Sequence, residues 1–407
     1  MKYIILVNDG MADYRLPELN NKTPMQVADT PNLNKIVPKS KCGRLITIPP
    51  GSEPGSDAAN LSILGYDPKI HFTGRGPLEA AAQGIKLGDN DIAFRCNLIT
   101  EKDGVLVDYS AGHISNPEAK QLIDKLNAKI GTENRRFYSG LSYRNLLILK
   151  NTRLSEKILT TPPHNINGKP ISENLVKPLE SEGVKTATFL NEMIFKSKEI
   201  LENHPINLER IKNNENPANM IWPWSGGRKP QMQTLKEKYH ITSAVISAVD
   251  LIKGIGFYAG MDVINVPGAT GLYDTNYEGK ADYALESLKT HDFVFVHVEA
   301  PDEAGHAGKI ELKIKTIENF DQRLLGRILK ALGNDDFRIA VLPDHPTPIK
   351  VRTHTSDPVP FLIYDPNKRG DGIEKFDEFS VEDGSLGTID GPDFLKLLLS
   401  KSNASKV

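Results

Sequence analysis

Short runs of apolar, β-branched and aromatic residues recur along the chain, and segments with helical spacing lie between them. The clearest apolar runs cover residues 3–7, 293–298, 338–342 and 359–364. Helical spacing is clearest over residues 281–288 and 317–332, and Gly333, directly after the second segment, is a typical helix stop. Strands that alternate with helices in this way are typical of a parallel sheet covered on both faces. The pattern predicts an α/β fold with a mostly parallel sheet and helices on both of its faces.

The middle of the chain has a different pattern of predicted elements from its two ends. Strand-like pieces at residues 92–98, 105–109 and 145–149 surround a helical segment at 117–127, and a loop rich in Pro, Asn and Gly follows at 161–170. These elements have the size of a small domain. We therefore expect a catalytic domain formed by residues 1–85 and 184–407, and a smaller inserted α/β domain formed by residues 86–183.

Length and composition agree with two domains. A chain of 407 residues is too long for one compact core, and 39% hydrophobic with 25% charged residues is ordinary for a globular protein. No apolar run approaches the roughly 20 residues that a membrane helix needs. The opening run ends early, at Asn8 and Asp9, which argues against a signal peptide. We therefore expect a cytoplasmic protein with no membrane partner.

Charge and cysteine content exclude further classes. The formal net charge is -2, and acidic and basic residues are interspersed, so the sequence does not predict the basic patch that binds nucleic acid. Cys42 and Cys96 lie far apart without metal-ligand spacing, so neither a disulfide framework nor a zinc ribbon is indicated. The lysine-rich segment 309–315 alternates with apolar residues and is expected to be a solvated helix face.

Acidic residues and histidines follow the predicted strands. Asp9 directly follows the first apolar run, Asp302 lies just past the run at 293–298, and Asp344 with His345 terminates the run at 338–342. Ligands gather at the carboxyl ends of the strands in an open parallel sheet, so these groups are expected to converge. An Asp at a strand end is often only a helix cap, and each of these residues alone is weak evidence.

The spacing of Asp302 and His306 indicates a metal site. Residues four apart on a helix share a face and can bind one ion, and His354 is available from a nearby loop. Asp and His together suit zinc, manganese or iron, whereas magnesium favours oxygen ligands. Three carboxylates and three imidazoles exceed the needs of one tetrahedral ion, so we expect two ions, which can clamp a phosphoryl group between them.

Ser56 is the candidate nucleophile. Residues 49–55 are dominated by Pro and Gly, and residues from Ser56 onward are compatible with a helix. Backbone N–H groups at a helix N-terminus favour an anion, and a serine there can attack phosphorus. The alternative is that Ser56 is only an N-cap. Ser52 is the competing nucleophile, but the proline after Glu53 makes it a poorer helix start.

The order of these parts resembles a known superfamily. An early Asp, a Ser that opens a helix, Asp-x-x-x-His, Asp-His and a final His is the order found in the alkaline phosphatase superfamily. Within it, the chain resembles the archaeal-type branch of the cofactor-independent phosphoglycerate mutases. The matching segments are 7–13, 30–35, 55–68, 73–80 and 297–306.

This resemblance implies a ligand set and a reaction. Asp9, Ser56, Asp344 and His345 would hold one metal ion, and Asp302, His306 and His354 the other. The ions would be Mn²⁺ or Zn²⁺, with Mg²⁺ or Co²⁺ as alternatives, and no bisphosphoglycerate would be needed. The enzyme would be an isomerase of glycolysis and gluconeogenesis that interconverts 3-phosphoglycerate and 2-phosphoglycerate through a phosphoserine at Ser56. The inserted domain would close over the small phosphorylated substrate.

Basic residues are also needed for the phosphate and carboxylate of such a substrate, and Arg suits both by bidentate hydrogen bonding. The candidates for substrate binding are Arg75, Arg95, Asn97, Arg144 and Lys280. The alternative for each is a surface charge, and for Arg144 this alternative is favoured.

Asn60 departs from the pattern, since many relatives carry His there. The opening segment 7–13 also resembles a subgroup proposed to phosphorylate homoserine in threonine biosynthesis, although no P-loop is present. A phosphotransferase or phosphatase acting on another small molecule is therefore the alternative function, and a non-catalytic metal-binding protein is the third. The native metals and the oligomeric state stay open.

Overall fold

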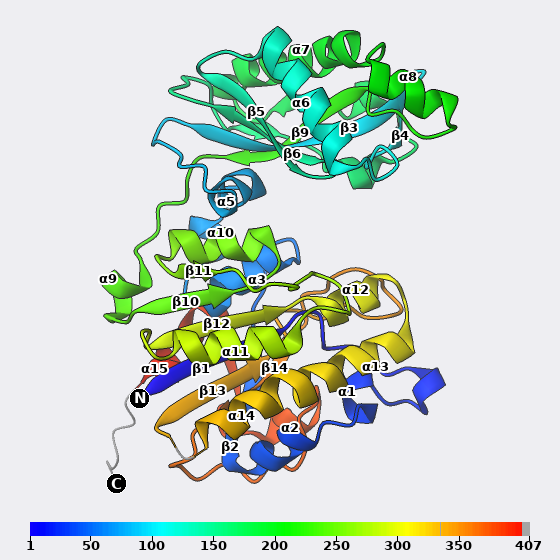
Figure 1. Ribbon diagram of the computed structural model, residues 1–407. Coiled ribbons are helices and arrows are strands. Elements are labelled where there is room, and N and C mark those ends of the chain that lie inside the picture. Colours follow the sequence, from blue (N-terminus) through cyan, green and yellow to red (C-terminus); the bar gives the residue numbers. More distant parts are fainter. Residues whose placement is uncertain (334, 401–407) are drawn as a thin grey trace. The chain divides into compact units, whose positions relative to one another are not determined.

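The computed structural model describes residues 1–333 and 335–400. The chain forms two compact units, which we call unit 1, residues 1–72 and 231–407, and unit 2, residues 73–230 (Figure 1). The second unit is therefore an insertion between two parts of the first.

Unit 1 is built on an eight-stranded sheet in the order β11-β10-β12-β1-β13-β14-β2-β15. The strands are β1 (Lys2–Asn8), β2 (Ser40–Ile46), β10 (Ser243–Ile246), β11 (Asp262–Ile264), β12 (Phe293–Val298), β13 (Phe337–Leu342), β14 (Val359–Tyr364) and β15 (Thr388–Asp390). Only β14 runs antiparallel to its neighbours; every other pairing in this sheet is parallel. The prediction of a mostly parallel sheet is confirmed.

Helices cover both faces of this sheet, as predicted. They are α1 (Pro24–Val27), α2 (Pro31–Ile36), α3 (Ser56–Ile63), α4 (Pro68–His71), α9 (Leu235–Tyr239), α10 (Asp250–Tyr258), α11 (Tyr277–Ser287), α12 (Ala300–His306), α13 (Ile310–Asn319), α14 (Gly326–Leu332) and α15 (Phe394–Leu399). A π-helical turn, Phe320–Leu325, joins α13 to α14. Helices α2, α11 and α14 pack on one face, and α10 and α15 pack on the other (Figure 1).

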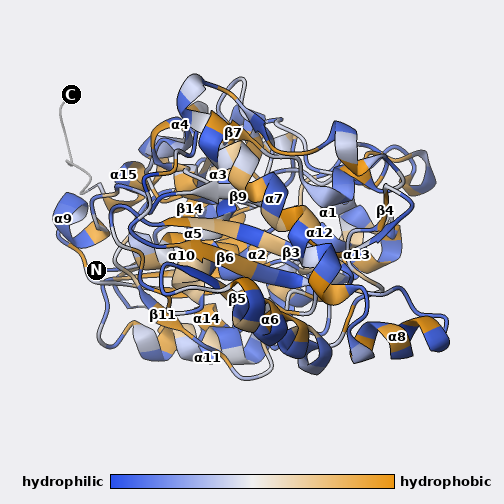
Figure 2. Cartoon of the chain, turned by 90° about the horizontal axis from the view of Figure 1, so that it is seen from above, coloured by the Kyte–Doolittle hydropathy of each residue, from blue (hydrophilic) through white to orange (hydrophobic). Residues whose placement is uncertain are grey.

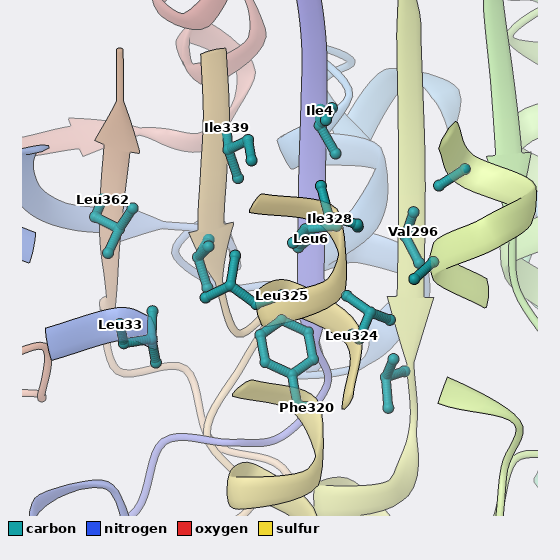
Figure 3. Close-up of a cluster of buried hydrophobic side chains, with 14 of the residues drawn as sticks. Ile4, Leu6, Leu33, Val296, Phe320, Leu324, Leu325, Ile328, Ile339 and Leu362 are labelled. Atoms are coloured by element: carbon teal, nitrogen blue, oxygen red, sulfur yellow. The ribbon is translucent and has the colours of Figure 1, made fainter. Parts of the chain in front are cut away.

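The main core of unit 1 lies between the sheet and the helices α2 and α14. Ile4, Leu6 and Val296 from the central strands meet Leu324 and Ile328 from the helical layer (Figure 3). Each of these side chains is fully buried. Burial of one such side chain contributes about 1.5–3 kcal/mol, so this layer holds the central strands rigidly in register.

Unit 2 is an antiparallel sheet with helices on both sides. Its elements are α5 (Arg75–Ala82), β3 (Ile92–Lys102), β4 (Val105–Asp108), α6 (Asn116–Ile130), β5 (Arg135–Leu141), β6 (Arg144–Leu149), β7 (Ile158–Leu159), β8 (Lys177–Pro178), α7 (Val184–Leu201), α8 (Pro205–Lys212) and β9 (Met220–Gly227). The strand order is β4-β3-β6-β5, with β9 paired to β3. Hydrophilic and hydrophobic residues both occur along α6, as expected for a helix that covers a sheet (Figure 2).

Unit 2 extends beyond the bounds of 86 and 183 that the sequence suggested for the insertion. At its beginning, α5 packs so closely on β3 that a Cβ on Gly76 would lie 2.2 Å from the carbonyl oxygen of Ala93. At its end, β9 completes the sheet by pairing with β3, for example Cys96 with Pro223. Contacts between segments that are distant in sequence set these limits. The local sequence pattern does not reveal such contacts.

In the part of the chain that the structure describes, none of the helices combines the length and apolar character required to cross a membrane.

Candidate active site

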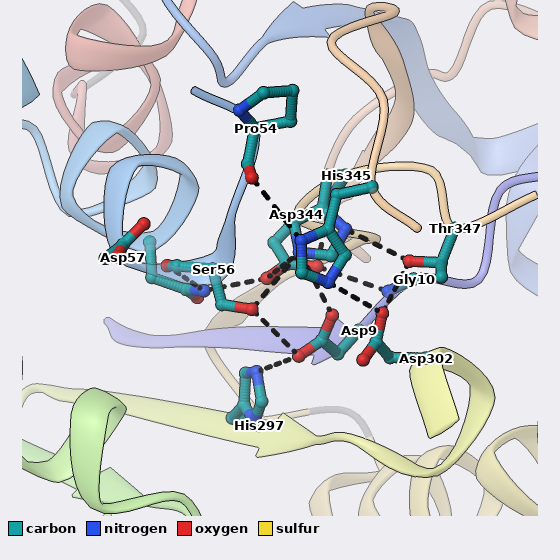
Figure 4. A network of polar contacts seen from close by, with 12 residues as sticks. Asp9, Gly10, Pro54, Ser56, Asp57, His297, Asp302, Asp344, His345 and Thr347 are labelled. Carbon is teal, nitrogen blue, oxygen red and sulfur yellow. Dashed lines mark hydrogen bonds and ion pairs between the residues drawn. The ribbon is translucent and has the colours of Figure 1, made fainter. Parts of the chain in front are cut away.

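The strand order of unit 1 brings the predicted ligands to one place. Strand β1 lies between β12 and β13, and all three run in the same direction. Asp9 follows β1, Asp344 follows β13, and Asp302 lies in α12, the helix that follows β12. Their side chains point toward one another at the carboxyl edge of the sheet (Figure 4). The expected convergence is therefore present in the structure.

A glycine allows this close approach. Gly10 has a φ of +63°, and a Cβ placed there would lie 2.7 Å from Cα of Asp302 and 2.6 Å from Oγ1 of Thr347. Its backbone N–H donates to Oδ1 of Asp344 at 3.2 Å. A side chain at this position would be strained and would separate the loops that carry Asp302 and Asp344.

Four residues form what we call the buried group: Asp9, Ser56, Asp344 and His345. Oγ of Ser56 lies 3.1 Å from Nε2 of His345 and 3.5 Å from Oδ2 of Asp9. Nε2 of His345 is 3.6 Å from Oδ1 of Asp9 and also 3.6 Å from Oδ2 of Asp344. Asp9 is 1% exposed, and Asp344 and His345 are fully buried. One ion among these four side chains would meet oxygen and nitrogen donors on several sides.

Ser56 is not the N-cap of its helix. Gly55 takes that position, and Ser56 is the first residue of α3. Its hydroxyl is therefore free of a capping role and is directed at Asp9 and His345 (Figure 4). Asn60, one turn later, donates from Nδ2 to the carbonyl oxygen of Ser56 and to Oδ2 of Asp344, both at 2.8 Å. Asn60 thus fixes Asp344 relative to the serine.

Asp302, His306 and His354 form a second cluster, which we call the outer group. Nε2 of His306 lies 3.2 Å from Oδ2 of Asp302, and Nε2 of His354 lies 3.4 Å from Oδ1. The two Nε2 atoms are 3.0 Å apart. Nδ1 of His306 lies 3.0 Å from the carbonyl oxygen of Arg352, a second contact that fixes the orientation of the ring.

His297 and Glu299 were missed by the sequence analysis. His297 is fully buried within β12, and its Nε2 lies 3.0 Å from Oδ2 of Asp9. Ligand atoms of Asp9, His297 and Asp344 lie within 4.8 Å of one another, as do those of Asp9, Glu299 and Asp302. An imidazole inside a strand that is otherwise apolar was the available signal, because a buried polar group needs a partner.

The electrostatics of the buried group fit a bound cation. Burial, together with repulsion from Asp344 and Asp302, raises the pKa of Asp9 well above its ordinary value. Oδ1 of Asp9 is buried and forms no hydrogen bond. Burial also lowers the pKa of His345, which favours its neutral, ligating form. Buried carboxylates crowded beside neutral imidazoles are the donor set that divalent transition metals require.

Comparison with known proteins decides the family. Residues 38–207 match the family model described as 2,3-bisphosphoglycerate-independent phosphoglycerate mutase. The mutase of that name from Methanosarcina barkeri is 53% identical over 402 residues, which cover 98% of this chain and 99% of that protein. A second, from Methanothermobacter thermautotrophicus, is 50% identical over 399 residues, with 98% and 97% covered. The chain belongs to this mutase family.

Solved structures agree with that membership. The cofactor-independent phosphoglycerate mutase of Thermoplasma acidophilum is 32% identical, with a TM-score of 0.69 over 98% of this chain and 99% of that one. A Pyrococcus horikoshii protein, also 32% identical, has a TM-score of 0.84 over 99% of both chains. The resemblance stated from the sequence motifs is confirmed. The mutase family is metal-dependent, and this chain carries carboxylate and imidazole groups able to hold metal.

A buried ion pair fixes the loops of this mutase site. Lys313 was expected on a solvated helix face, and this expectation is wrong, because the side chain is fully buried. Its ammonium donates to Oδ2 of Asp13 at 2.7 Å and to the carbonyl oxygens of Ala12 and Thr347 at 3.1 and 2.9 Å. Oγ1 of Thr347 in turn donates to Oδ1 of Asp302 at 2.5 Å. Lys313 therefore ties the loop after β1 to the loop after β13.

Three of the predicted substrate-binding residues are arginines of unit 2. Arg95 is mostly buried, its Nε lies 3.0 Å from Oε1 of Glu79, and its guanidinium lies over the ring of Trp224 at 4.5 Å. Burial lowers the pKa of Arg95, and the charges of Arg75 and Arg144 act in the same direction. The charge of Glu79 acts in the opposite direction and raises the pKa of Arg95. Three guanidinium groups thus lie near one another, and one of them is paired with a carboxylate.

The two other predicted residues are held by structural contacts. Asn97 in β3 accepts a hydrogen bond from Nε1 of Trp224 at 2.9 Å and donates to the carbonyl oxygen of Tyr109 at 3.2 Å. Lys280 in α11 is fully buried and donates to the carbonyl oxygen of His297 at 2.9 Å. Burial lowers the pKa of Lys280 to about 8. These contacts stabilise β3 and β12.

Proposed function

We propose that this chain interconverts 3-phosphoglycerate and 2-phosphoglycerate through a phosphoserine at Ser56. The observation that carries the proposal is the position of Oγ of Ser56, 3.1 Å from Nε2 of His345 and 3.5 Å from Oδ2 of Asp9, at the first residue of α3. Relatives that cover the whole chain at 50–53% identity are named for the same reaction. A cluster of carboxylates and imidazoles around a serine hydroxyl is suited to phosphoryl transfer.

In the first step, Oγ of Ser56 loses its proton and forms a bond to phosphorus, while the bond between phosphorus and the substrate oxygen breaks and that oxygen takes up a proton. In the second step, the other hydroxyl of the bound glycerate loses its proton and forms a bond to phosphorus, the bond from phosphorus to Oγ breaks, and the Ser56 hydroxyl is restored. Asp9 accepts the hydrogen bond of the Ser56 hydroxyl and so directs its oxygen. Backbone N–H groups of the first turn of α3 face the negative charge of the transferred group.

The proposal includes two divalent ions. Asp9, Ser56, Asp344 and His345 would hold one, and Asp302, His306 and His354 the other. Mn²⁺ or Zn²⁺ suits these mixed oxygen and nitrogen donors, with Mg²⁺ or Co²⁺ as alternatives. When bound, the ions would supply Lewis-acid stabilisation of the phosphoryl charge.

Substrate binding is assigned to the arginines of unit 2. Arg75, Arg95 and Arg144 offer bidentate donors for the carboxylate and phosphate of phosphoglycerate, whereas Asn97 and Lys280 would act by supporting the strands that they contact. The proposal gives unit 2 the role of a substrate-capping domain. It also places the reaction in the cytoplasm, where glycolytic intermediates occur.

The test is isomerisation by purified, Mn²⁺-loaded protein supplied with 3-phosphoglycerate and no bisphosphoglycerate, coupled to enolase. Ser56→Ala should eliminate turnover while metal content and folding are kept. Ser52→Ala is the matched control, because Ser52 lies in the loop just before α3 and outside the cluster, and this variant should keep activity. Homoserine with ATP is assayed in parallel. ATP-dependent formation of phosphohomoserine without isomerisation, or isomerisation by Ser56→Ala, would overturn the proposal.

A further inference from the structure

We propose that unit 1 binds a small organic phosphate ester at a second site, in a cavity at the amino end of β13. Five basic side chains and one acidic side chain line this cavity within the described residues, which gives it a net charge of +4. The basic residues are Lys39, Lys41, Arg338, Lys368 and Arg369, and the acidic residue is Asp365. So many like charges around one hollow favour an anion.

The site is separate from the metal cluster. Arg338 is the second residue of β13, whereas Asp344 follows the other end of the same strand. From position 338 to position 344 an extended chain covers about 20 Å. A molecule in this cavity therefore does not contact the buried group or the outer group.

Arg338 gives the cavity a fixed anchor. Its side chain is 6% exposed, and Nε donates to Oδ2 of Asp365 at 2.9 Å. Nη1 donates to the carbonyl oxygens of Leu398 and Ser400 at 2.9 and 2.5 Å, which holds the guanidinium plane rigid. Nη2 forms no hydrogen bond with any residue that the structure describes. A buried, pre-oriented donor in a cavity wall is suited to a phosphate oxygen.

Three further cations line the cavity without a carboxylate partner among the described residues: Lys39, Lys41 and Arg369. The chain holds two of them together, because a Cβ on Gly370 would lie 2.3 Å from the carbonyl carbon of Lys39. The loop that carries Arg369 thus packs directly on the start of β2. The exposed side chains of Lys39 and Arg369 therefore extend from neighbouring stretches of backbone.

Apolar side chains also line the cavity. Ile363 of β14 pairs with Lys41 of β2, and Leu386 and Leu397 complete the lining. The cavity has a volume of about 150 Å³. A cavity of that order accommodates a group the size of a benzene ring. A lining that combines apolar side chains with cations favours a phosphate ester that carries a small apolar group over inorganic phosphate.

The experiment measures binding by calorimetry to full-length Ser56→Ala protein, in which the proposed turnover is blocked. The probes are phenyl phosphate, AMP and inorganic phosphate. The triple variant Lys39→Ala, Lys41→Ala, Arg369→Ala should bind phenyl phosphate at least about tenfold more weakly, because three positive charges that would face the phosphate are lost. The control removes the same charge elsewhere on unit 1, with Lys236→Ala, Lys289→Ala and Lys330→Ala, and should change the affinity less than twofold.

The proposal would be overturned if both triple variants lost affinity for phenyl phosphate to the same extent. It would also be overturned if the protein bound phenyl phosphate and inorganic phosphate with equal affinity. With Ser56 restored, the first triple variant should retain the isomerisation rate of the unmodified protein; a parallel loss of that rate would contradict a separate site. AMP that binds more tightly than phenyl phosphate would identify nucleotides as the source of the ligand, and the reverse order would identify other phosphate esters. Both orders support the site.

Discussion

The buried group and the outer group use the same types of side chain but differ in exposure and in charge balance. Asp344 and His345 have no exposed surface, whereas the side chains of His306 and His354 are 35% and 20% exposed. The buried group has two carboxylates for one imidazole. The outer group has one carboxylate, Asp302, for two imidazoles. Position in the fold, rather than residue type, separates the two halves of the site.

This difference sets what each half requires. Although burial opposes it, the hydrogen bond and charge of Asp302 raise the pKa of His306 to about 9. Burial acts to raise the pKa of Asp302, but hydrogen bonds from His306 and His354 lower it well below its ordinary value. The outer group therefore neutralises itself with an imidazolium. The buried group has no such cation. Burial and the charges of Asp344 and Asp302 raise the pKa of Asp9, so its ionised form is disfavoured when no ion is bound. We infer that the buried group depends more strongly on a bound ion.

The largest expected effect comes from a carboxylate of the buried group. Asp344→Asn keeps the shape of the side chain but removes its charge, so one ion per chain should be lost. The isomerisation rate should fall by roughly 10³-fold or more, because the ion that Asp344 would hold no longer stabilises the charge of the transferred phosphoryl group. Elemental analysis and the enolase-coupled assay measure both quantities. Recovery of activity with excess Mn²⁺ would contradict the stronger dependence of the buried group.

A large effect on stability is expected from the ion pair that holds the two loops together. Lys313→Met leaves Asp13 buried without its partner, which costs about 3–5 kcal/mol. Urea unfolding measures the loss in free energy. Lys315→Met is the control, since Lys315 is 60% exposed and its pair with Glu318 lies on the surface. That change should cost under about 1 kcal/mol. Equal costs in the two variants would mean that Lys313 does not act as a clamp.

A smaller, reversible effect is expected in the outer group. His306→Ala leaves Asp302 and His354 as ligands, so affinity for one of the two ions should fall by roughly 10–100-fold. Excess metal should restore most of the activity, in contrast to Asp344→Asn. His291→Ala is a suitable control, because His291 pairs with Asp262 near the opposite end of β12. Metal titration followed by activity measures the difference. A loss that excess metal cannot repair would place His306 functionally with the buried group.

The strands and the ligand residues were predictable from the sequence, because each depends on local pattern. Strand β12 is found at the predicted residues 293–298, and Asp302 and His306 follow it on one helix. The resemblance also divided these residues into two sets. The structure places the four residues of the buried group near one another, and likewise the three of the outer group. Their roles as metal ligands stay predictions. Periodicity, turn chemistry and motif spacing carry this information.

The misses share a different cause. Lys313 has the sequence surroundings of a surface lysine, and only the packing of α13 against the loop at Thr347 buries it. His297 lies within an apolar run, where a single imidazole gives no periodic signal. The limits of unit 2 depend on the pairing of β3 with β9, elements more than 100 residues apart. Contacts between distant segments decide all three, and one sequence does not display them.

The smallest expected effect is a pH dependence of the free energy of unfolding that comes from the outer group and not from the buried group. In metal-free protein, the folded pKa of His306, about 9, lies above the value of 6.5 for an ordinary histidine. The folded state therefore binds the proton more tightly. Its contribution to stability is complete below pH 6.5 and is lost as the pH rises through about 9. Urea unfolding of chelator-treated protein between pH 6 and pH 10 should show this decline.

His306→Gln should flatten the curve in that window, and saturating metal should do the same, because metal binding requires the deprotonated imidazole. His291→Gln, at an imidazole remote from the metal ligands, is the control and should leave the slope unchanged. A decline that persists in His306→Gln would assign the titration to a different group and remove the internal neutralisation that distinguishes the outer group from the buried one.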